Sequence, residues 1–454
     1  MSTFVAGLRS SALLRPLRNT SFRDFWLGQV LVSSTGDQIT LVALTWLALE
    51  LTDSGLALGA VLTAAAIPRA LLMLVGGAAS DHWSPRSVML VTNAVRGVVT
   101  AALGVLVLTG ELQFWQLLIL AASFGVMDAF FYPAESSIVP GLVPSEALEP
   151  ANALAQGTMQ LAGLIGPAVG GILVAAVSTA PAFLLDAVTF LVGVLALARV
   201  HYVRPTSPAA HDPQAESGTV SGGPAGGRLL STIRAGFRYA WDDRGLRAIL
   251  IMIAAVDFAF IGAIAVGLAW LADTRFGGAA DFGFMLAGWS GGALLGAIVA
   301  GSVGQVRRAG VMLIVIIGAM GLGLGLIGLA PSAGLIIGVL GLMGLGNGFV
   351  NVTAIAGLQR RVEPRMLGRV MSLVMLASTG LSPISLAVAG PLVEADTVLY
   401  FLACGAIVVI ATAVGLRLGA GDYFEPRPEP PGASVSAAKV DLEATERRPG
   451  VTAG

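Results

Sequence analysis

Long apolar runs alternate with short polar segments along most of this chain. A helix needs about 20 apolar residues to cross a hydrocarbon core of about 30 Å, and twelve runs reach that length. The pattern predicts spanning helices near residues 24–50, 56–79, 87–109, 113–133, 151–177, 180–199, 247–271, 282–303, 309–330, 333–356, 367–391 and 397–418. The expected fold is therefore an all-α polytopic membrane protein.

The composition agrees with this expectation, because 56% of the 454 residues are hydrophobic and only 12% are charged. A soluble domain carries about 25% charged residues. The single cysteine, Cys404, lies inside an apolar run, so an intramolecular disulfide is excluded. The first 24 residues hold four arginines but no apolar core with a cleavage site, so we do not expect a cleaved signal peptide.

The basic residues give the chain an orientation. If both termini lie in the cytoplasm, all but three of the 26 Arg and Lys residues fall in cytoplasmic segments. The exceptions are Arg275 on the outside and Arg69 and Arg96 within spans. This asymmetry is what the positive-inside rule expects of a correctly counted membrane protein. We therefore expect a multi-pass protein of the plasma membrane with cytoplasmic N- and C-termini.

These patterns divide the chain into five parts: an N-terminal cytoplasmic arm (1–23), a six-helix half (24–199), a cytoplasmic linker (200–246), a second six-helix half (247–419) and a tail (420–454). The linker begins with a stretch rich in Pro, Gly and Ser. It then shows an apolar stripe at helical spacing near 229–243, which predicts a helix lying flat on the membrane interface. The polar, proline-bearing tail is expected to be disordered.

The two six-helix halves share landmarks at a nearly constant offset, which suggests internal duplication. Asp37 matches Asp257 at an offset of 220, and the segment around Asp128 matches the one around Asn347 at 219. Residues 87–90 match 310–313, and Pro167 matches Pro383. Chance similarity between apolar sequences is the alternative. Duplicated halves with a site at their interface are a transporter architecture.

The stretch GGAASDHWSPRSVML at 76–90 resembles the loop signature of the major facilitator superfamily. Its glycine, acidic and final basic positions are filled by Gly77, Asp81 and Arg86. The sequence departs from the signature at His82, Ser84 and Pro85, but Ser84 can cap the following helix and Pro85 suits its first turn. The resemblance implies a gating loop that latches the cytoplasmic ends of the two halves; a plain polar turn is the alternative.

The stretch GLIGPAVGGIL at 163–173 is similar to the antiporter signature of the same superfamily. The matching residues are Gly166, Pro167, Gly170 and Gly171. Small residues allow close helix packing and proline can bend a helix, so packing alone also explains them. With FRDFWLGQ, FFYPAESSIVPGLVP and LQRRVEPRMLGRVMSL, these segments resemble the drug/proton antiporter branch near the macrolide-efflux and enterobactin-exporter proteins. The resemblance covers roughly residues 20–420 and implies the twelve-helix major facilitator fold.

Charged residues inside a bilayer are costly and mark functional sites by default. The embedded acids are Asp37, Asp128, Asp186 and Asp257, and no histidine lies within a span. Because burial disfavours a charged carboxylate, such a group can load and release a proton near cellular pH.

Asp37, with its neighbour Gln38, is the first candidate for the protonation site or for a contact with a cationic substrate. Asp257 and Asp128 follow, and Arg96 is the expected counter-charge of whichever acid it reaches. The competing interpretation is structural, in which Asp37 only holds its helix in place. We expect Asp186 to be structural and leave Arg69 open between structure and function.

Other classes of function lack the residues they require. The only lysine is Lys439, in the tail, so a phosphate-binding loop for ATP is excluded. Three scattered histidines and one cysteine predict no metal site, and no basic soluble domain suggests nucleic-acid binding. We expect a monomeric transporter, not an enzyme, that uses no cofactor beyond the proton gradient.

The leading prediction is proton-driven export of small amphipathic or drug-like molecules, with export itself implied by the resemblance alone. The alternatives are a dedicated exporter of a metabolite such as a siderophore, a lysophospholipid or lipid transporter without proton coupling, and a non-transporting membrane receptor or scaffold.

Overall fold

The computed structural model describes residues 12–203, 238, 241, 243–304, 308–362 and 364–421, and all regular structure in these residues is helical. The first half contains η1 (Ala12–Arg18), α2 (Thr20–Phe25), η2 (Trp26–Ser33), α3 (Ser34–Thr52), α4 (Gly55–His82), α5 (Pro85–Thr109), α6 (Phe114–Ile138), η3 (Val139–Gly141), η4 (Ser145–Ala147), α7 (Leu148–Ala176) and α8 (Thr179–Arg199). The second half contains α10 (Arg244–Gly262), η6 (Ala263–Gly267), α11 (Leu268–Leu271), η7 (Ala272–Phe276), α12 (Ala279–Val303), α13 (Ala309–Leu329), α14 (Ala333–Arg361), α15 (Pro364–Thr379), α16 (Ser382–Ala395) and α17 (Thr397–Arg417).

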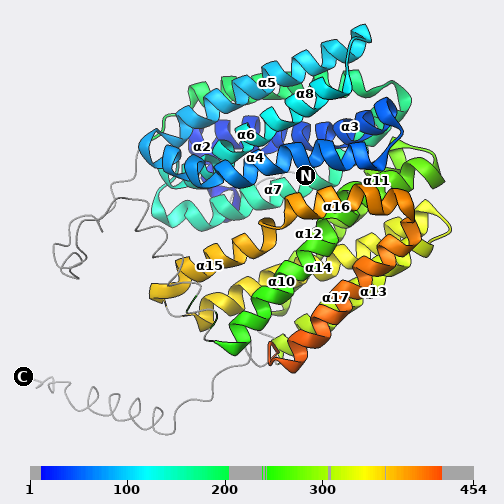
Figure 1. Ribbon diagram of the computed structural model, residues 1–454. Helices are drawn as coiled ribbons and strands as arrows, with labels where there is room; N and C mark the ends of the chain where they lie inside the picture. The colour runs from blue at the N-terminus through cyan, green and yellow to red at the C-terminus, as the bar shows by residue number, and fades with distance from the viewer. Residues whose placement is uncertain are drawn as a thin grey trace, which may run out of the picture.

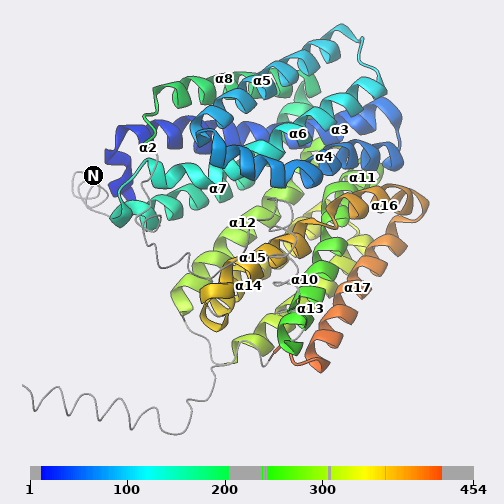
Figure 2. The same cartoon turned by 60° about the vertical axis from the view of Figure 1, so that its left-hand side comes forward.

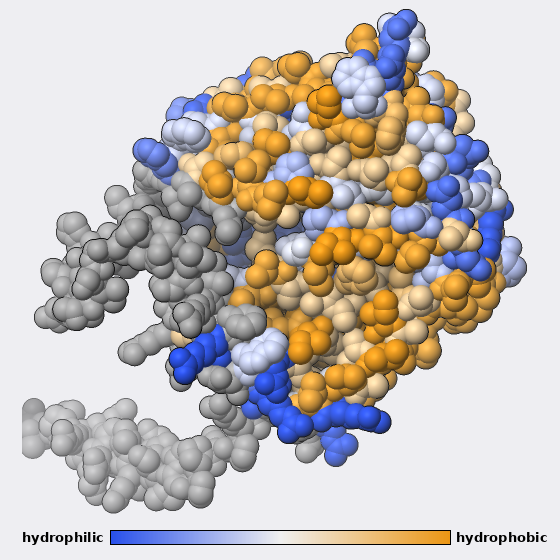
Figure 3. Space-filling model, viewed as in Figure 1, coloured by the Kyte–Doolittle hydropathy of each residue, from blue (hydrophilic) through white to orange (hydrophobic). Residues whose placement is uncertain are grey.

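Twelve helical stretches in the described residues are long and apolar enough to cross a membrane, which confirms the predicted number of spans. The predicted start of the third span is also confirmed. The Ser84 side chain accepts a hydrogen bond from the Ser87 amide at 3.2 Å, and Pro85 occupies the first turn of α5. Large apolar side chains cover the outer surface in a band between two polar ends (Figure 3).

The structure differs from the prediction at the eleventh span, where one helix was expected over 367–391. The chain forms two helices there, α15 and α16, separated at Gly380 and Leu381. Pro383 lies in the first turn of α16, where its missing N–H and fixed φ suit a helix start and oppose a helix interior.

The first span of each half contains a wide-turn π-helical segment: η2 in the first half, and η6 and η7 in the second. π-Helical segments are uncommon in proteins overall, and those that occur are often found at functional sites. Their presence in both first spans fits the predicted duplication of the two halves.

The predictions for the polar segments concern residues that fall largely outside the described part of the chain. The predicted interfacial helix near 229–243 is described only at Arg238, Trp241 and Asp243. Of the tail, Ala420 and Gly421 are described. Ala420 is fully buried, and Gly421 packs directly against Gly310 of α13. The described residues therefore extend two positions past the predicted end of the second half.

The two halves form separate bundles that meet along two helix pairs, α7 with α12 and α4 with α16 (Figures 1 and 2). We call the end of the molecule that carries residues 12, 203, 243 and 421 the terminus side, and the opposite end the far side. Direct contacts between the halves, such as Gly55 with Gly390, lie toward the far side. Toward the terminus side the bundles diverge, and the surface in Figure 3 is hollowed between them. The space between the halves therefore opens on the terminus side.

Candidate functional site

An ion pair between Arg96 of α5 and Asp128 of α6 forms the centre of the first half. The Arg96 Nη2 atom donates to Asp128 Oδ1, and the Arg96 side chain is only 3% exposed. Arg69 of α4 approaches the second oxygen of Asp128, with Nη1 and Oδ2 at 3.7 Å. Asp128 is 17% exposed, so one side of the carboxylate is reachable. The predicted counter-charge Arg96 thus pairs with Asp128, the third of the candidate acids.

Two aromatic rings lie close to the Arg96 guanidinium. Its central carbon lies 4.3 Å from the centre of the Phe131 ring and 5.8 Å from that of Phe190. Both rings are buried. Cation–π contacts in a desolvated site contribute about 2 kcal/mol, so these rings help to offset the burial of the guanidinium charge.

Asp37 lies in the first turn of α3, directly after the π-helical segment η2. It is partly exposed and lies within electrostatic range of Arg96, Asp128 and Asp186. The helix that carries it, α3, packs against α4, α6, α7 and α8 of its own half and against α11 and α12 of the second half. Its neighbour Gln38 packs against Gly166 of α7, where an added Cβ would lie 2.5 Å from the Gln38 Cβ.

Asp186 of α8 has the surroundings that a structural carboxylate requires. It is completely buried, and its two oxygens accept hydrogen bonds from the hydroxyls of Thr40 and Thr189, both at 2.7 Å. A Cβ at Gly36 would collide with Asp186 and Thr189. Asp186 therefore joins α8 to α3 directly beside Asp37.

Asp257 of α10 lies apart from this cluster, in the second half. The hydroxyl of Ser378, on α15, hydrogen-bonds its carboxylate. Asp37 and Asp257 thus occupy corresponding spans, but the charged residues that act on Asp37 all belong to the first half.

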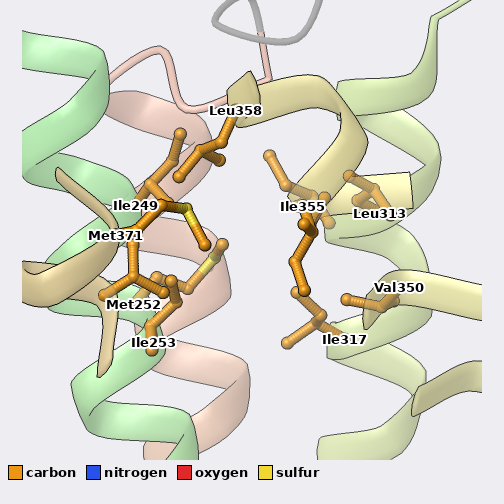
Figure 4. A pocket seen from close by; sticks show the side chains of 12 residues that line it. Ile249, Met252, Ile253, Leu313, Ile317, Val350, Ile355, Leu358 and Met371 are labelled. Carbon is orange, nitrogen blue, oxygen red and sulfur yellow. The ribbon is translucent and has the colours of Figure 1, made fainter. Parts of the chain in front are cut away.

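An apolar pocket of about 80 Å³ lies one turn from Asp257, between α10, α13, α14 and α15 (Figure 4). Ile253 and Val374 line it, and each lies four residues before Asp257 or Ser378 on the same helix face. The twelve lining residues are all aliphatic or methionine: Ile249, Met252, Ile253, Leu313, Ile314, Ile317, Val350, Ala354, Ile355, Leu358, Met371 and Val374. The second half therefore contains an apolar pocket with one carboxylate, that of Asp257, one helical turn from its lining.

The loop motif at residues 77–86 connects helices within the first half. Arg86 donates from Nε to the Leu197 carbonyl and from Nη2 to the Ala198 carbonyl, both at 2.8 Å. It therefore stabilises the C-terminal end of α8. Gly77 lies on α4 with open space at its Cβ position, and the side chain of Asp81 is outside the described residues. In this conformation Arg86 holds α5 to α8 and does not reach the second half.

The motif in α7 makes contacts on two faces of an unbroken helix. Gly166 and Gly170 pack on α3, whereas Gly171 faces α12. A Cβ at Gly171 would lie 2.5 Å from the Ala279 carbonyl oxygen, and the Pro167 carbonyl lies against Gly283. These small residues therefore let the two halves touch backbone to backbone.

Glu394 of α16 ties the halves together on the far side. Its carboxylate accepts hydrogen bonds from the Leu56 amide at 2.9 Å and the Ser54 hydroxyl at 3.1 Å, so a residue of the second half caps the N-terminus of α4 in the first. We expect Glu394→Ala to destabilise the far-side contact by about 1 kcal/mol. The population open on the far side should then rise several-fold, as measured by spin-label distances across that end.

The control for this variant is Glu111→Ala, which removes an exposed carboxylate from the loop between α5 and α6 on the far side. Unchanged distances in Glu394→Ala would show that the contact does not hold the halves together.

The sequence interpretation gave no role in this site to Glu135, considered Tyr132 only as an aromatic residue that could line a cavity, and left the role of Arg69 open. Glu135 and Tyr132 lie seven and four residues after Asp128, hence on the same face of α6, and this spacing was readable from the sequence. Arg69 had no such signal, because its approach to Asp128 depends on how α4 packs on α6. Within the part of the chain that the structure describes, no group of three or more His, Cys, Asp or Glu residues could hold a metal ion.

Comparisons with known proteins agree with this architecture. Residues 11–451 match the family described as transmembrane secretion effector. The multidrug efflux pump Tap of Mycobacterium tuberculosis (strain H37Rv) is 26% identical over 398 residues, which cover 86% of this chain and 91% of Tap. The enterobactin exporter EntS of Shigella boydii serotype 18 is 25% identical over 305 residues, covering 66% of this chain and 68% of EntS.

Solved structures share the fold at low sequence identity. The nucleoside transporter NupG superposes with a TM-score of 0.64 at 14% identity, covering 89% of this chain and 98% of NupG. A bacterial homologue of the human lysosomal transporter Spinster, solved in an inward-facing and unoccupied conformation, gives a TM-score of 0.61 at 15% identity, covering 89% of this chain and 98% of that one.

Twelve spans in two six-helix halves and a family match over nearly the whole chain lead to one conclusion. The chain belongs to the transmembrane secretion effector family of the major facilitator superfamily, and is a multi-pass membrane transporter and not an enzyme.

Proposed function

We propose that this protein exports small amphipathic molecules by alternating access, driven by proton antiport. The observation that carries the proposal is the position of Asp37. This partly exposed carboxylate lies in mid-span beside the buried Arg96–Asp128 pair. The names of the relatives Tap, a multidrug efflux pump, and EntS, an enterobactin exporter, support export as the direction.

The ion pair gives a physical means of coupling protons to conformation. A proton on Asp37 or Asp128 removes a negative charge next to Arg96, and breaking a buried ion pair in this way changes the free energy of its surroundings by several kcal/mol. Asp128 connects three helices, because Arg96 lies on α5 and Arg69 on α4. Protonation therefore changes how these helices are held and biases the equilibrium between the two access states.

The terminus side is proposed to be cytoplasmic. Basic residues gather on that side, as the positive-inside rule requires. In this orientation the structure opens toward the cytoplasm and is closed on the far side by the contacts of α7 with α12 and α4 with α16. It would then be the state that accepts substrate from the cell. We propose that the protein acts as a monomer in the plasma membrane and uses no cofactor other than the proton gradient.

The asymmetry of the two halves favours an amphipathic substrate. Charged groups gather in the first half, whereas the second offers an apolar pocket one turn from Asp257. A molecule with a basic group and an apolar body can use both surfaces. Transport of a siderophore is a second candidate, supported by the similarity to EntS. Lipid movement is a third, because an acyl chain also fits an apolar pocket.

Inverted vesicles with an acidic lumen test the proposal. Lipophilic cations, macrolides and siderophores are added in turn while lumenal pH is followed, with vesicles lacking the protein as the control. We expect at least one compound class to evoke proton release from the lumen. Release with siderophores alone would favour a dedicated exporter. No release with any compound would contradict proton antiport and make lipid movement the next measurement.

Filling the apolar pocket is expected to change affinity without changing coupling. Ala354→Trp places a large side chain in a cavity of about 80 Å³ between α10 and α14. An apolar contact of one or two methylene groups is worth about 1–3 kcal/mol, so KM for a compound with an apolar body should rise roughly tenfold or more. The control is Ala70→Trp, at an exposed position of α4. An unchanged KM would exclude the pocket from the substrate path.

A further inference from the structure

A line of buried polar side chains runs inside the first half, between η2 and α5. It consists of Gln29, Ser33, Asn93, Arg96 and Thr100, which we call the polar seam. Arg96 is 3% exposed and the other four are 0% exposed. Their spacings of four along η2, and of three and four along α5, place each set on one helix face. The seam therefore lies in the interior of the first half, where α8 packs against both η2 and α5.

The side chains of the seam meet at Gly193 of α8. Asn93 Nδ2 donates to Gln29 Oε1 at 2.5 Å. A Cβ added at Gly193 would lie 3.2 Å from that Gln29 oxygen, 3.3 Å from Asn93 Nδ2 and 3.5 Å from the Ser33 Cβ. Side chains from the first and third spans thus converge beside Gly193, where α8 contributes no side chain.

Five polar atoms of the seam have no hydrogen-bond partner among the described residues: Gln29 Nε2, Ser33 Oγ, Asn93 Oδ1, Arg96 Nε and Thr100 Oγ1. Such atoms are rare in native proteins, and their clustering indicates bound water or an ion. The set includes two obligate donors, Gln29 Nε2 and Arg96 Nε, and one obligate acceptor, Asn93 Oδ1. A cation here would be opposed by the two donors, and an anion would be opposed by the acceptor. Water can both donate and accept hydrogen bonds, so it can satisfy all of these atoms.

The seam is closed at its terminus-side end by an apolar cluster. Phe22, Phe25, Met89 and Leu197 are all buried there. Water in the seam would therefore be internal and ordered. It would contact Arg96 at Nε, whereas Asp128 accepts from Nη2.

We propose that the polar seam is an internal hydration site that stabilises the Arg96 guanidinium when Asp128 releases it. The role in transport rests on the proposed proton coupling. When a proton neutralises Asp128, the buried cation loses its main partner, and desolvation of an unpaired charge is costly. Water at Arg96 Nε lowers that cost, so the pair can open and close during each transport cycle. Ser33, Thr100 and the Gln29–Asn93 pair are positioning residues in this scheme.

The variant that tests the site is Ser33→Ala/Thr100→Val, which removes the two seam hydroxyls and nearly conserves volume. The control, Thr45→Val/Thr412→Val, removes two buried hydroxyls that donate to carbonyls outside the seam, those of Leu41 and Val408. Two measurements are made on each protein: the pH at which transport is half-maximal and the temperature of thermal unfolding. An experimental structure at a resolution that shows ordered water is determined for the wild type.

Without the hydroxyls, Arg96 depends more on the negative charge of Asp128, so opening the ion pair costs more and transport should require a higher proton concentration. The charged and titratable groups near Asp128 or its partner Arg96 are Arg69, Asp37, Tyr132, Glu135 and Asp186. None of these is altered. We expect the pH of half-maximal transport to fall by about one unit, a tenfold change in proton concentration, with no shift in the control.

The proposal would be overturned if the seam held no water. In that case the same measurements should give different results. Removing unpaired hydroxyls from a dry seam should raise the unfolding temperature and leave the pH dependence unchanged. The wild-type structure would then lack water density near Ser33, Asn93 and Arg96. Failure of the proposed function is distinguishable, because wild-type vesicles would then show no proton coupling whether or not the seam holds water.

Discussion

Asp37→Asn is expected to abolish substrate-evoked proton release while leaving the protein folded. Asparagine has nearly the volume of aspartate but cannot take up a proton, so an antiporter that uses Asp37 as its carrier loses coupling. The variant should remain folded, because the charge that it removes is partly exposed and the neighbouring Gln38 keeps its packing against Gly166. The measurement is lumenal pH in inverted vesicles after addition of a compound that the wild type transports, with detergent gel filtration to verify folding.

The matched control is Asp53→Asn, in the loop after α3. Asp53 adopts a left-handed conformation with φ 48°, which asparagine accepts readily. Proton release should be unchanged in this variant. If Asp37→Asn also retained release, Asp37 would be a substrate contact or a structural residue. Asp128 and Asp257 would then be tested in the same way.

Arg96→Gln is expected to produce the largest loss of stability of any single substitution in the site. The substitution leaves Asp128 with only the distant Arg69, and it removes the contacts with the Phe131 and Phe190 rings. Removing one partner of a buried ion pair costs about 3–5 kcal/mol, because the other charge stays buried without compensation. The measurement is the unfolding temperature in detergent, together with the yield of monodisperse protein.

Two further variants separate pairing from other roles of Arg96. Arg69→Gln should have a much smaller effect, because Arg69 is 39% exposed and its closest nitrogen lies 3.7 Å from the carboxylate. The double variant Arg96→Gln/Asp128→Asn should recover part of the lost stability, since no unpaired charge remains. A double variant as unstable as Arg96→Gln alone would show that the guanidinium acts through its aromatic contacts and not through the ion pair.

Much of the architecture was predictable because a bilayer acts on each span separately. Any helix that crosses must hide its backbone polar groups and present about 20 apolar residues, so the spans appear as runs in the sequence. The arginines mark one side for an equally local reason. Even the start of α5 followed from Ser84 and Pro85 alone. The eleventh span was the exception, because the prediction treated residues 367–391 as one helix and ignored the turn at Gly380.

The candidate site was predictable only as a set of residue types. An embedded acid is unusual wherever it lies, so Asp37, Asp128, Asp186 and Asp257 could be named at once. Their partners could not. Arg96 was expected to meet one of these acids, but which one depends on the rotation of α5 against α6. Arg86 illustrates the same limit, since it caps α8 in its own half.

The sequence by itself determined the number of spans, their grouping in two halves and the family to which the chain belongs. Each of these depends on local hydrophobicity, charge or short motifs. Only the tertiary structure decided that Arg96 pairs with Asp128, that an apolar pocket lies one turn from Asp257, and that Gln29, Ser33 and Asn93 meet at Gly193. Such contacts join residues from different spans. They depend on how each helix is turned about its own axis, and close packing of the whole bundle fixes that rotation.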